Sequence, residues 1–289
     1  MIDVILGVMA PVALIIAVGA LWDRLRQPFD AAFVGSLVYY IGGPCLTYAT
    51  LVDYQFTASV QRLALAAVAA LVFFGVAGAI ALRLLRLDQR SYLNSILFPN
   101  LGNMGLPVAL FAFGEPGLAL AVVVFTIGSV AHSSVGIWIA SGRLAPTELL
   151  KAPLLYATLL ALLGQGGLEP PLFVLRAVEI LGGVTIPLML LSLGVSLSRL
   201  KISNTQRAMT LAGLRLGIGL VGGLLVAWAF ALPPLERGVL VMGAVMPAAV
   251  FNYLLAERFK TAPEDVAGGV ALSTLASFVV LPLVLAFAV

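Results

Sequence analysis

The chain has 289 residues, of which 62% are hydrophobic and only 10% are charged. Soluble domains carry roughly 25% charged residues, so this composition excludes an ordinary soluble protein and predicts a chain that crosses a bilayer several times. The net charge of +3 is expected to reflect basic loops at the membrane surface rather than a nucleic-acid-binding site. One cysteine, Cys45, cannot form an intramolecular disulfide, and with one histidine the sequence offers little basis for a metal centre or a bound cofactor.

Ten apolar segments follow one another along the chain, and most have close to the ~20 residues needed to cross a bilayer. We therefore predict an all-α membrane protein with ten transmembrane helices. The predicted spans are residues 4–21, 33–51, 63–84, 92–113, 118–140, 152–166, 172–197, 208–232, 238–256 and 266–289. The connections between them are short, and no soluble domain is apparent.

Basic residues in the loops predict the orientation. Because loops rich in Lys and Arg stay in the cytoplasm, loops 1, 3, 5, 7 and 9 should be cytoplasmic and both termini should lie outside, in a protein of the cytoplasmic (inner) membrane. The other loops hold only Arg62, Arg176 and Arg237. The basic residues of the odd-numbered loops are Arg24, Arg26, Arg83, Arg86, Arg90, Arg143, Lys151, Arg199, Lys201, Arg207, Arg258 and Lys260.

The fourth predicted span is interrupted by residues that do not suit a continuous helix. Proline removes a backbone donor and clashes with the preceding turn, and glycine accepts almost any backbone angle. Unwound backbone at membrane depth is tolerated only where it is buried in protein or lines a cavity. We therefore predict a broken helix with two amide side chains inside the break. The residues concerned are Pro99, Gly102, Gly105 and Pro107, with Asn100 and Asn103 between them.

A second interruption lies in the ninth span, where Pro247 is followed by Asn252. Spans 2 and 7 also contain a proline each, Pro44 and Pro187. The distance along the chain from Pro44 to Pro99 is 55 residues, and the distance from Pro187 to Pro247 is similar, at 60 residues. Broken helices in corresponding positions of two halves are the best sequence pointer to the binding site of a secondary transporter. The spacing predicts two halves of five helices with opposite orientation, a 5+5 inverted repeat.

The run at residues 99–107, Pro-Asn-Leu-Gly-Asn-Met-Gly-Leu-Pro, resembles the fourth-helix motif of the auxin efflux carrier family. Residues 245–252 resemble the second crossover helix of that family, and residues 185–197 and 273–282 resemble its seventh and tenth helices. The resemblance covers essentially the whole chain and indicates a bacterial, permease-type member. The long central loop of the plant carriers is absent, which speaks against auxin itself as the substrate.

The resemblance implies an architecture like that of sodium/bile-acid symporters and sodium/proton antiporters, with helices 4 and 9 crossing at their breaks. It implies a scaffold formed by helices 1–2 (residues 1–57) and 6–7 (residues 143–203). It further implies a moving transport unit formed by helices 3–5 (residues 58–142) and 8–10 (residues 204–289). Members of the family are usually homodimers.

The broken helices would present helix ends to a ligand. N-terminal ends carry a partial positive charge that suits a carboxylate, whereas C-terminal ends and freed carbonyl groups suit a cation. Asn100, which matches the family's crossover asparagine, is expected to donate to the substrate, while Asn103 and Asn252 either do the same or cap the broken ends. The candidate substrate-binding residues are Asn100, Gly102, Asn103, Pro107, Pro247, Asn252, His132, Ser133 and Arg215.

Two ionisable side chains inside the spans are functional candidates. His132, in a polar cluster with Ser133, either carries a coupling proton or forms a neutral hydrogen bond between helices. Arg215, nine residues into span 8, either serves as the counter-charge of an anion or extends back to the cytoplasmic surface.

No carboxylate lies near either break, which argues against a cation exchanger. We therefore expect a secondary transporter that moves a small organic anion, such as a dicarboxylate or an auxin-like acid, by an elevator-type alternating-access mechanism. A sodium-coupled symporter of a neutral or organic-acid solute and a channel-like pore remain as alternatives, and the coupling ion, H⁺ or Na⁺, is left open. A membrane enzyme has no support, because no acidic residue orients the histidine toward a nucleophile.

Overall fold

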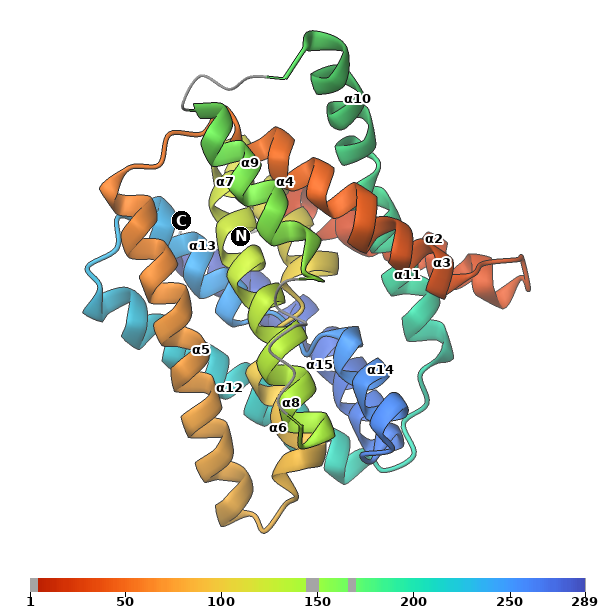
Figure 1. The fold of residues 1–289 in the computed structure, drawn as a ribbon. Coiled ribbons are helices and arrows are strands. Elements are labelled where there is room, and N and C mark those ends of the chain that lie inside the picture. The colour runs from red at the N-terminus through yellow and green to blue at the C-terminus, as the bar shows by residue number, and fades with distance from the viewer. Residues whose placement is uncertain (1–4, 144–150, 166–169, 289) are drawn as a thin grey trace.

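The computed structural model describes residues 5–143, 151–165 and 170–288, and this part of the chain is helical (Figure 1). The first half contains η1 (Ile5–Met9), α2 (Ala10–Arg24), α3 (Ala31–Leu37), η2 (Val38–Gly42), α4 (Gly43–Leu51), α5 (Ala58–Leu84), α6 (Gln89–Leu97), η3 (Leu101–Gly105), α7 (Leu106–Ala131), η4 (His132–Gly136) and α8 (Ile137–Ser141), where η marks a π-helix. The second half contains α9 (Pro153–Gln165), α10 (Leu172–Gly183), α11 (Thr185–Arg199), α12 (Thr205–Ala229), α13 (Pro234–Ala244), α14 (Val250–Phe259) and α15 (Pro263–Ala288).

Within the described residues, six helical stretches are long and apolar enough to cross a membrane by themselves. They are Leu6–Arg24, Ala58–Leu84, Leu101–Ser141, Leu172–Arg199, Thr205–Ala229 and Pro263–Ala286. These stretches confirm an all-α membrane protein. The predicted spans 2, 4 and 9 are divided into shorter pieces, and the sixth contains the 13-residue helix α9, so the count of ten helices stays a prediction.

Helix ends are set by local capping, which moves several boundaries away from the predicted ones. Asp88 caps α6, because its carboxylate accepts a hydrogen bond from the Ser91 amide at 2.8 Å, and Asn204 caps α12 through the Arg207 amide at 3.0 Å. α12 consequently begins three residues before the predicted span. Gly114 has a φ of 67° and turns the chain inside α7, between the predicted spans 4 and 5.

One group of helices is formed by α2, α4, α9, α10 and α11. α2 packs along α11, and α4 packs against both α9 and α10. The α2–α11 contact is close enough to need glycine, because a Cβ on Gly194 would lie 2.1 Å from the carbonyl oxygen of Ile16. In the same group, a Cβ on Gly42 of η2 would lie 2.5 Å from Oγ1 of Thr185. The irregular parts of the predicted spans 2 and 7 therefore lie against each other.

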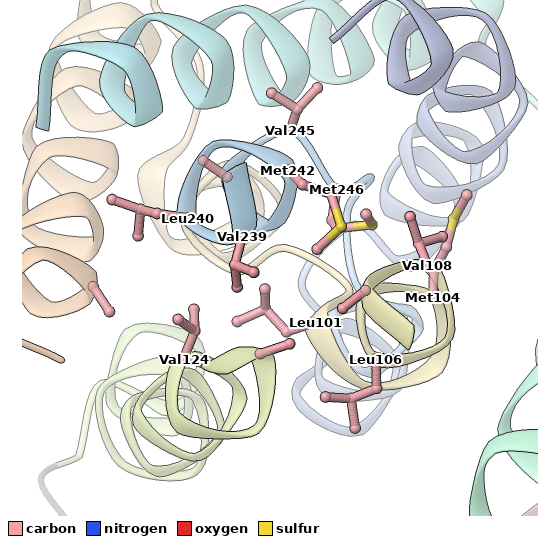
Figure 2. Packing of buried hydrophobic residues seen from close by; sticks show 14 of the residues in the cluster. Leu101, Met104, Leu106, Val108, Val124, Val239, Leu240, Met242, Val245 and Met246 are labelled. Atoms are coloured by element: carbon pink, nitrogen blue, oxygen red, sulfur yellow. The ribbon is translucent and has the colours of Figure 1, made fainter. Parts of the chain in front are cut away.

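A second group is formed by α5, α6, α7, α12, α13, α14 and α15. α12 packs against α5, α13 and α15, while α7 packs against α5 and α13. In this group a Cβ on Gly222 of α12 would lie 2.4 Å from the ring of Phe73. η3 and the C-terminal part of α13 lie in the middle of the buried core, where Leu101 lies close to Val124 and Val239 (Figure 2).

Several helix ends that carry predicted cytoplasmic loops contact one another in pairs. Nε of Arg90, at the start of α6, donates to the carbonyl of Ala140 at the end of α8, at 2.9 Å. Arg199, at the end of α11, forms a 2.8 Å ion pair with Asp23 at the end of α2. The α5–α6 and α14–α15 turns lie at the same end of the molecule, the lower end in Figure 1. The side of the membrane that this end faces remains a prediction.

Candidate substrate site at the crossing of the broken helices

The two predicted breaks meet. Between α6 and η3, Pro99 pairs with Ala248, which lies between α13 and α14, in an isolated antiparallel bridge. The Asn100 amide donates to the carbonyl of Pro247 at 2.7 Å, and the Ala249 amide donates to the carbonyl of Phe98 at 3.2 Å. Pro99 and Pro247 have no N–H to donate, so the donors of this pair are the residues beside them. Two extended segments in the core thus satisfy each other's backbone groups.

Four helix ends lie beside this crossing. α6 ends at Leu97 and α13 ends at Ala244, and both present carbonyl groups; η3 begins at Leu101 and α14 at Val250, and both present amide groups. A helix end leaves backbone groups without partners inside the helix, and these groups carry about half a unit charge, negative at the C-terminus and positive at the N-terminus. The crossing therefore brings charges of both signs together in the core.

Arg215 reaches the negative ends. Its side chain extends from α12, is fully buried, and donates from Nη1 to the carbonyl of Ile96 and from Nη2 to the carbonyl of Ala244. Its guanidinium carbon lies 4.8 Å from the centre of the Phe74 ring. Of the two alternatives for Arg215, extension to the cytoplasmic surface is therefore wrong, because its side chain is held at the crossing by two helix ends. Its role toward an anion stays a prediction.

The asparagines of the two breaks differ in their partners. Asn252 donates from Nδ2 to the carbonyl of Phe98 at 3.1 Å, so it ties α14 to the end of α6. Asn100 is 4% exposed and uses its backbone in the crossing, but its side-chain nitrogen has no protein partner and does not cap η3. Asn103 lies in η3 and is half-buried. The side-chain nitrogen of Asn100 and the side-chain oxygen of Asn252 are thus both buried without a protein partner.

His132 lies beside the crossing. Its ring stacks on Phe98 at a centroid distance of 4.1 Å and meets the edge of Phe251 at 4.9 Å, and it faces the side chain of Asn252. Gly136 makes room for the ring, because a Cβ there would lie 2.7 Å from Cδ2 of His132. The His132 Nε2 atom is buried and has no protein partner. The histidine therefore belongs to the wall of the candidate site through Phe98 and Asn252.

The remaining predicted site residues contribute to the local structure around the crossing. Ser133 is turned toward its own helix, where its hydroxyl donates to the carbonyl of Ser129 at 2.9 Å. Gly102 allows η3 to approach α7, since a Cβ there would lie 2.9 Å from the Phe125 ring. Gly105 ends η3, and Pro107 is buried where η3 passes into α7, so its missing amide falls at the change from π-helix to α-helix.

Two contributors lie outside the predicted site residues. Ser273 of α15 accepts a hydrogen bond from the Ala248 amide at 3.1 Å, so its hydroxyl supports the second break. Phe98 provides both the ring under His132 and the carbonyl that Ala249 and Asn252 share. Ser273 can be recognised in the sequence as a polar residue within an apolar helix. Phe98 has no such signal, because its contribution is largely a backbone carbonyl.

A small cavity adjoins the crossing. It measures about 20 Å³ and is lined almost entirely by apolar groups, among them Phe74, Pro99, Leu101, Val124 and Leu240. Figure 2 shows Leu101, Val124 and Leu240 among the residues packed there. A cavity of this size holds about one water molecule.

Comparison with known proteins gives a family match. The model of the family described as "Membrane transport protein" matches residues 137–285, just over half of the chain, including α12, both segments of the second break and most of α15. An "uncharacterized transporter" of Methanocaldococcus jannaschii is 28% identical over 207 residues. A second "uncharacterized transporter", of Methanothermobacter thermautotrophicus, is 29% identical over 190 residues.

Each of these two alignments spans 64% of this chain and 63% of the relative, less than two thirds of either protein. The family match is therefore the stronger of the two findings, and the matched residues include the second break. The chain belongs to the auxin efflux carrier family of membrane transport proteins.

Proposed function

We propose that the protein is a secondary transporter of a small organic anion, with its binding site at the crossing of the two broken helices. The observation that carries this proposal is the charge at the crossing. Arg215 already neutralises the C-terminal ends of α6 and α13, so the positive N-terminal ends of η3 and α14 are left in excess. A negatively charged ligand would balance them.

The hydrogen-bonding groups favour the same ligand. The Asn100 Nδ2 atom is a donor without a protein partner, and it lies on the residue that precedes the N-terminal end of η3. Within the described part of the chain, no hydrogen bond or ion pair of Asn100, Asn252 or Arg215 involves a carboxylate. A carboxylate of the substrate would supply the acceptor that Asn100 lacks, in a setting where charged hydrogen bonds are strong.

The proposed mechanism is elevator-type alternating access. The group formed by α2, α4, α9, α10 and α11 would act as the scaffold, corresponding to residues 1–57 and 143–203. The group that contains α5–α7 and α12–α15 would carry the substrate. The cavity beside the crossing lies within the carrying group and is too small for such a substrate, so binding would require a structural change.

The pairing of irregular segments supports the proposed 5+5 inverted repeat with ten spans. Gly42 lies against Thr185 in the scaffold group, and Pro99 pairs with Ala248 in the carrying group. Both contacts join corresponding spans of the two halves. The proposed assembly, a homodimer in the cytoplasmic membrane with both termini outside, follows from the family resemblance and the basic loops.

A thermal-shift screen of the purified protein identifies the substrate class. Mono- and dicarboxylates are compared with their neutral amides at fixed ionic strength. A ligand at 100 times its Kd stabilises the protein by about 2.7 kcal/mol, a shift of several degrees in Tm. We expect carboxylates to raise the Tm and their amides to leave it unchanged. Equal shifts from both would contradict an anion site.

A further inference from the structure

The position of Arg215 bears on the coupling ion. The C-terminal ends of discontinuous helices, with their unwound carbonyl groups, are where transporters of this kind coordinate Na⁺. Here the carbonyls of Ile96 and Ala244, one from each broken span, both accept hydrogen bonds from the Arg215 guanidinium. A cation attached to α12 thus fills the place that a free cation would take.

We propose that Arg215 is a built-in cation that replaces a coupling Na⁺ at the crossing, so that substrate binding and transport do not depend on Na⁺ there. This inference rests on the proposed function, since it assumes that the crossing is the transport site. Arg215 acts as a positioning residue: it neutralises and joins the two C-terminal ends, which keeps the N-terminal ends facing the ligand.

The surroundings of the guanidinium fit this role. The Phe74 ring lies 4.8 Å from it and offers its electron-rich face to the charge. Gly219, one turn further along α12, leaves the space it needs, because a Cβ there would lie 2.5 Å from Nη2 of Arg215 and 2.1 Å from the carbonyl oxygen of Ala244. The helix is therefore shaped to bring a buried guanidinium to this place.

Three buried hydroxyl groups of α15 are already used within the protein, whereas the Ser95 hydroxyl, beside Ile96, has no protein partner. Ser273 accepts from the Ala248 amide and donates to the carbonyl of Val270, and Thr274 donates to the same carbonyl at 2.8 Å. Ser277 donates to the carbonyl of Thr274 at 2.6 Å. The hydroxyl groups of α15 are therefore committed to backbone partners, and the cation that contacts the carbonyl ends is Arg215.

Chemical rescue tests the proposal. Arg215→Ala removes the guanidinium and leaves two carbonyl ends without a cation. Guanidinium chloride at about 10 mM, far below denaturing concentrations, should raise the Tm of this variant by about 3–5 °C if it binds with a Kd near 1 mM. Urea at the same concentration has nearly the same shape without the charge and should have no effect. Arg207→Ala, which removes a partly exposed arginine of the same helix, is the matched control and should respond to neither.

Sodium provides the second measurement. Replacing NaCl with choline chloride at constant ionic strength should leave the Tm of the wild-type protein, and its uptake of a carboxylate, unchanged. The same exchange should lower the Tm of Arg215→Ala, because Na⁺ can then bind the freed carbonyls. A wild-type protein that requires Na⁺ for uptake, or a variant that responds equally to guanidinium and urea, would overturn the proposal.

If Arg215→Ala does not fold, Arg215→Lys and Arg215→Met replace it. Lysine keeps the charge and methionine keeps much of the volume, so the lysine variant should have the higher Tm, and equal values would overturn the proposal. The Tm measurements need no substrate. If the protein carries no organic anion, uptake fails while guanidinium still rescues Arg215→Ala, and the two proposals are thereby judged separately.

Discussion

The amide nitrogen of Asn100 lies 2.7 Å from the carbonyl oxygen of Pro247, although 147 positions separate these residues in the chain. This hydrogen bond and its counterpart between Ala249 and Phe98 hold two unwound segments together inside an apolar core. Backbone groups in such a core must be paired, so the two breaks depend on each other. The backbone of Asn100 is thereby fixed, while its side-chain nitrogen has no protein partner.

Asn100→Ala should weaken substrate binding without unfolding the protein. The backbone hydrogen bond to Pro247 is kept, whereas the donor to the substrate carboxylate is lost. Hydrogen bonds to charged groups contribute about 1.5–3 kcal/mol, which corresponds to roughly a 10- to 150-fold loss of affinity. The affinity is measured by titration with the carboxylate found in the screen. Unchanged affinity in a folded Asn100→Ala variant would leave the Asn100 side chain without a role in binding.

Arg215→Gln should reduce uptake of a carboxylate more than uptake of its neutral analogue. Glutamine can still donate one hydrogen bond, but it leaves the negative helix ends without a full charge. Arg215→Lys should restore part of the activity, because it keeps the charge without the planar fork that reaches both carbonyls. Uptake is normalised to the amount of reconstituted protein. Equal losses for both solutes would mean that Arg215 only supports folding.

Gly219→Ala should destabilise the protein, because the new Cβ would lie 2.1 Å from the carbonyl oxygen of Ala244 and would displace the Arg215 side chain. Overpacking of this kind typically costs about 1–3 kcal/mol. Gly217→Ala on the same helix meets nothing within 4 Å and should be neutral or stabilising by up to about 1 kcal/mol. Thermal unfolding in detergent compares the Tm values of the two variants. Equal Tm values would mean that α12 and α13 are not in close contact at Gly219.

Ser273→Ala should destabilise the second break. The Ala248 amide then has no acceptor in the core, and an unpaired buried donor costs about 1–3 kcal/mol. Thr274→Val is the control, because the hydroxyl it removes donates only to a carbonyl of its own helix. The variants are compared by thermal unfolding and by binding of the carboxylate. A loss of stability in Thr274→Val as large as that in Ser273→Ala would speak against a special role for Ser273.

Cysteines introduced one at a time at Ser141 and Glu115, in a Cys45→Ala background, should be labelled from opposite sides of the membrane. Ser141 ends α8 on the predicted cytoplasmic side, and Glu115 follows the turn at Gly114 on the other side. Labelling with a membrane-impermeant reagent, before and after permeabilisation, distinguishes the two. Access to both from one side would rule out the ten-span topology.

The sequence was sufficient to locate both breaks, because proline and glycine inside apolar runs oppose a continuous helix. It also singled out Asn100 as a polar side chain within such a break, and the role of this side chain in binding stays a prediction. The pairing between the breaks could not be derived from the chain alone, since the hydrogen bonds of Asn100 and Ala249 join backbone groups that every residue carries. For the same reason the partners of Arg215, two helix-end carbonyls, have no signature in the sequence.

The span boundaries show a second limit. Hydropathy identifies where a helix becomes apolar, whereas α12 begins at the residue after Asn204, whose side chain caps it. The π-helical turns η3 and η4 were also not predicted, because the same apolar pattern suits an α-helix. His132 could be recognised as a polar residue within a span, but its stacking on Phe98 depends on the way the first break brings that ring beside η4.

Uptake of a carboxylate into proteoliposomes, compared with uptake of its neutral amide by the same preparation, tests the central claim most directly. The account predicts saturable uptake of the carboxylate, little uptake of the amide, and loss of carboxylate uptake in Asn100→Ala. Uptake that does not saturate would indicate a pore rather than a carrier. Equal transport of the amide, or transport of a cation through the same site, would contradict an anion site at the crossing of the broken helices.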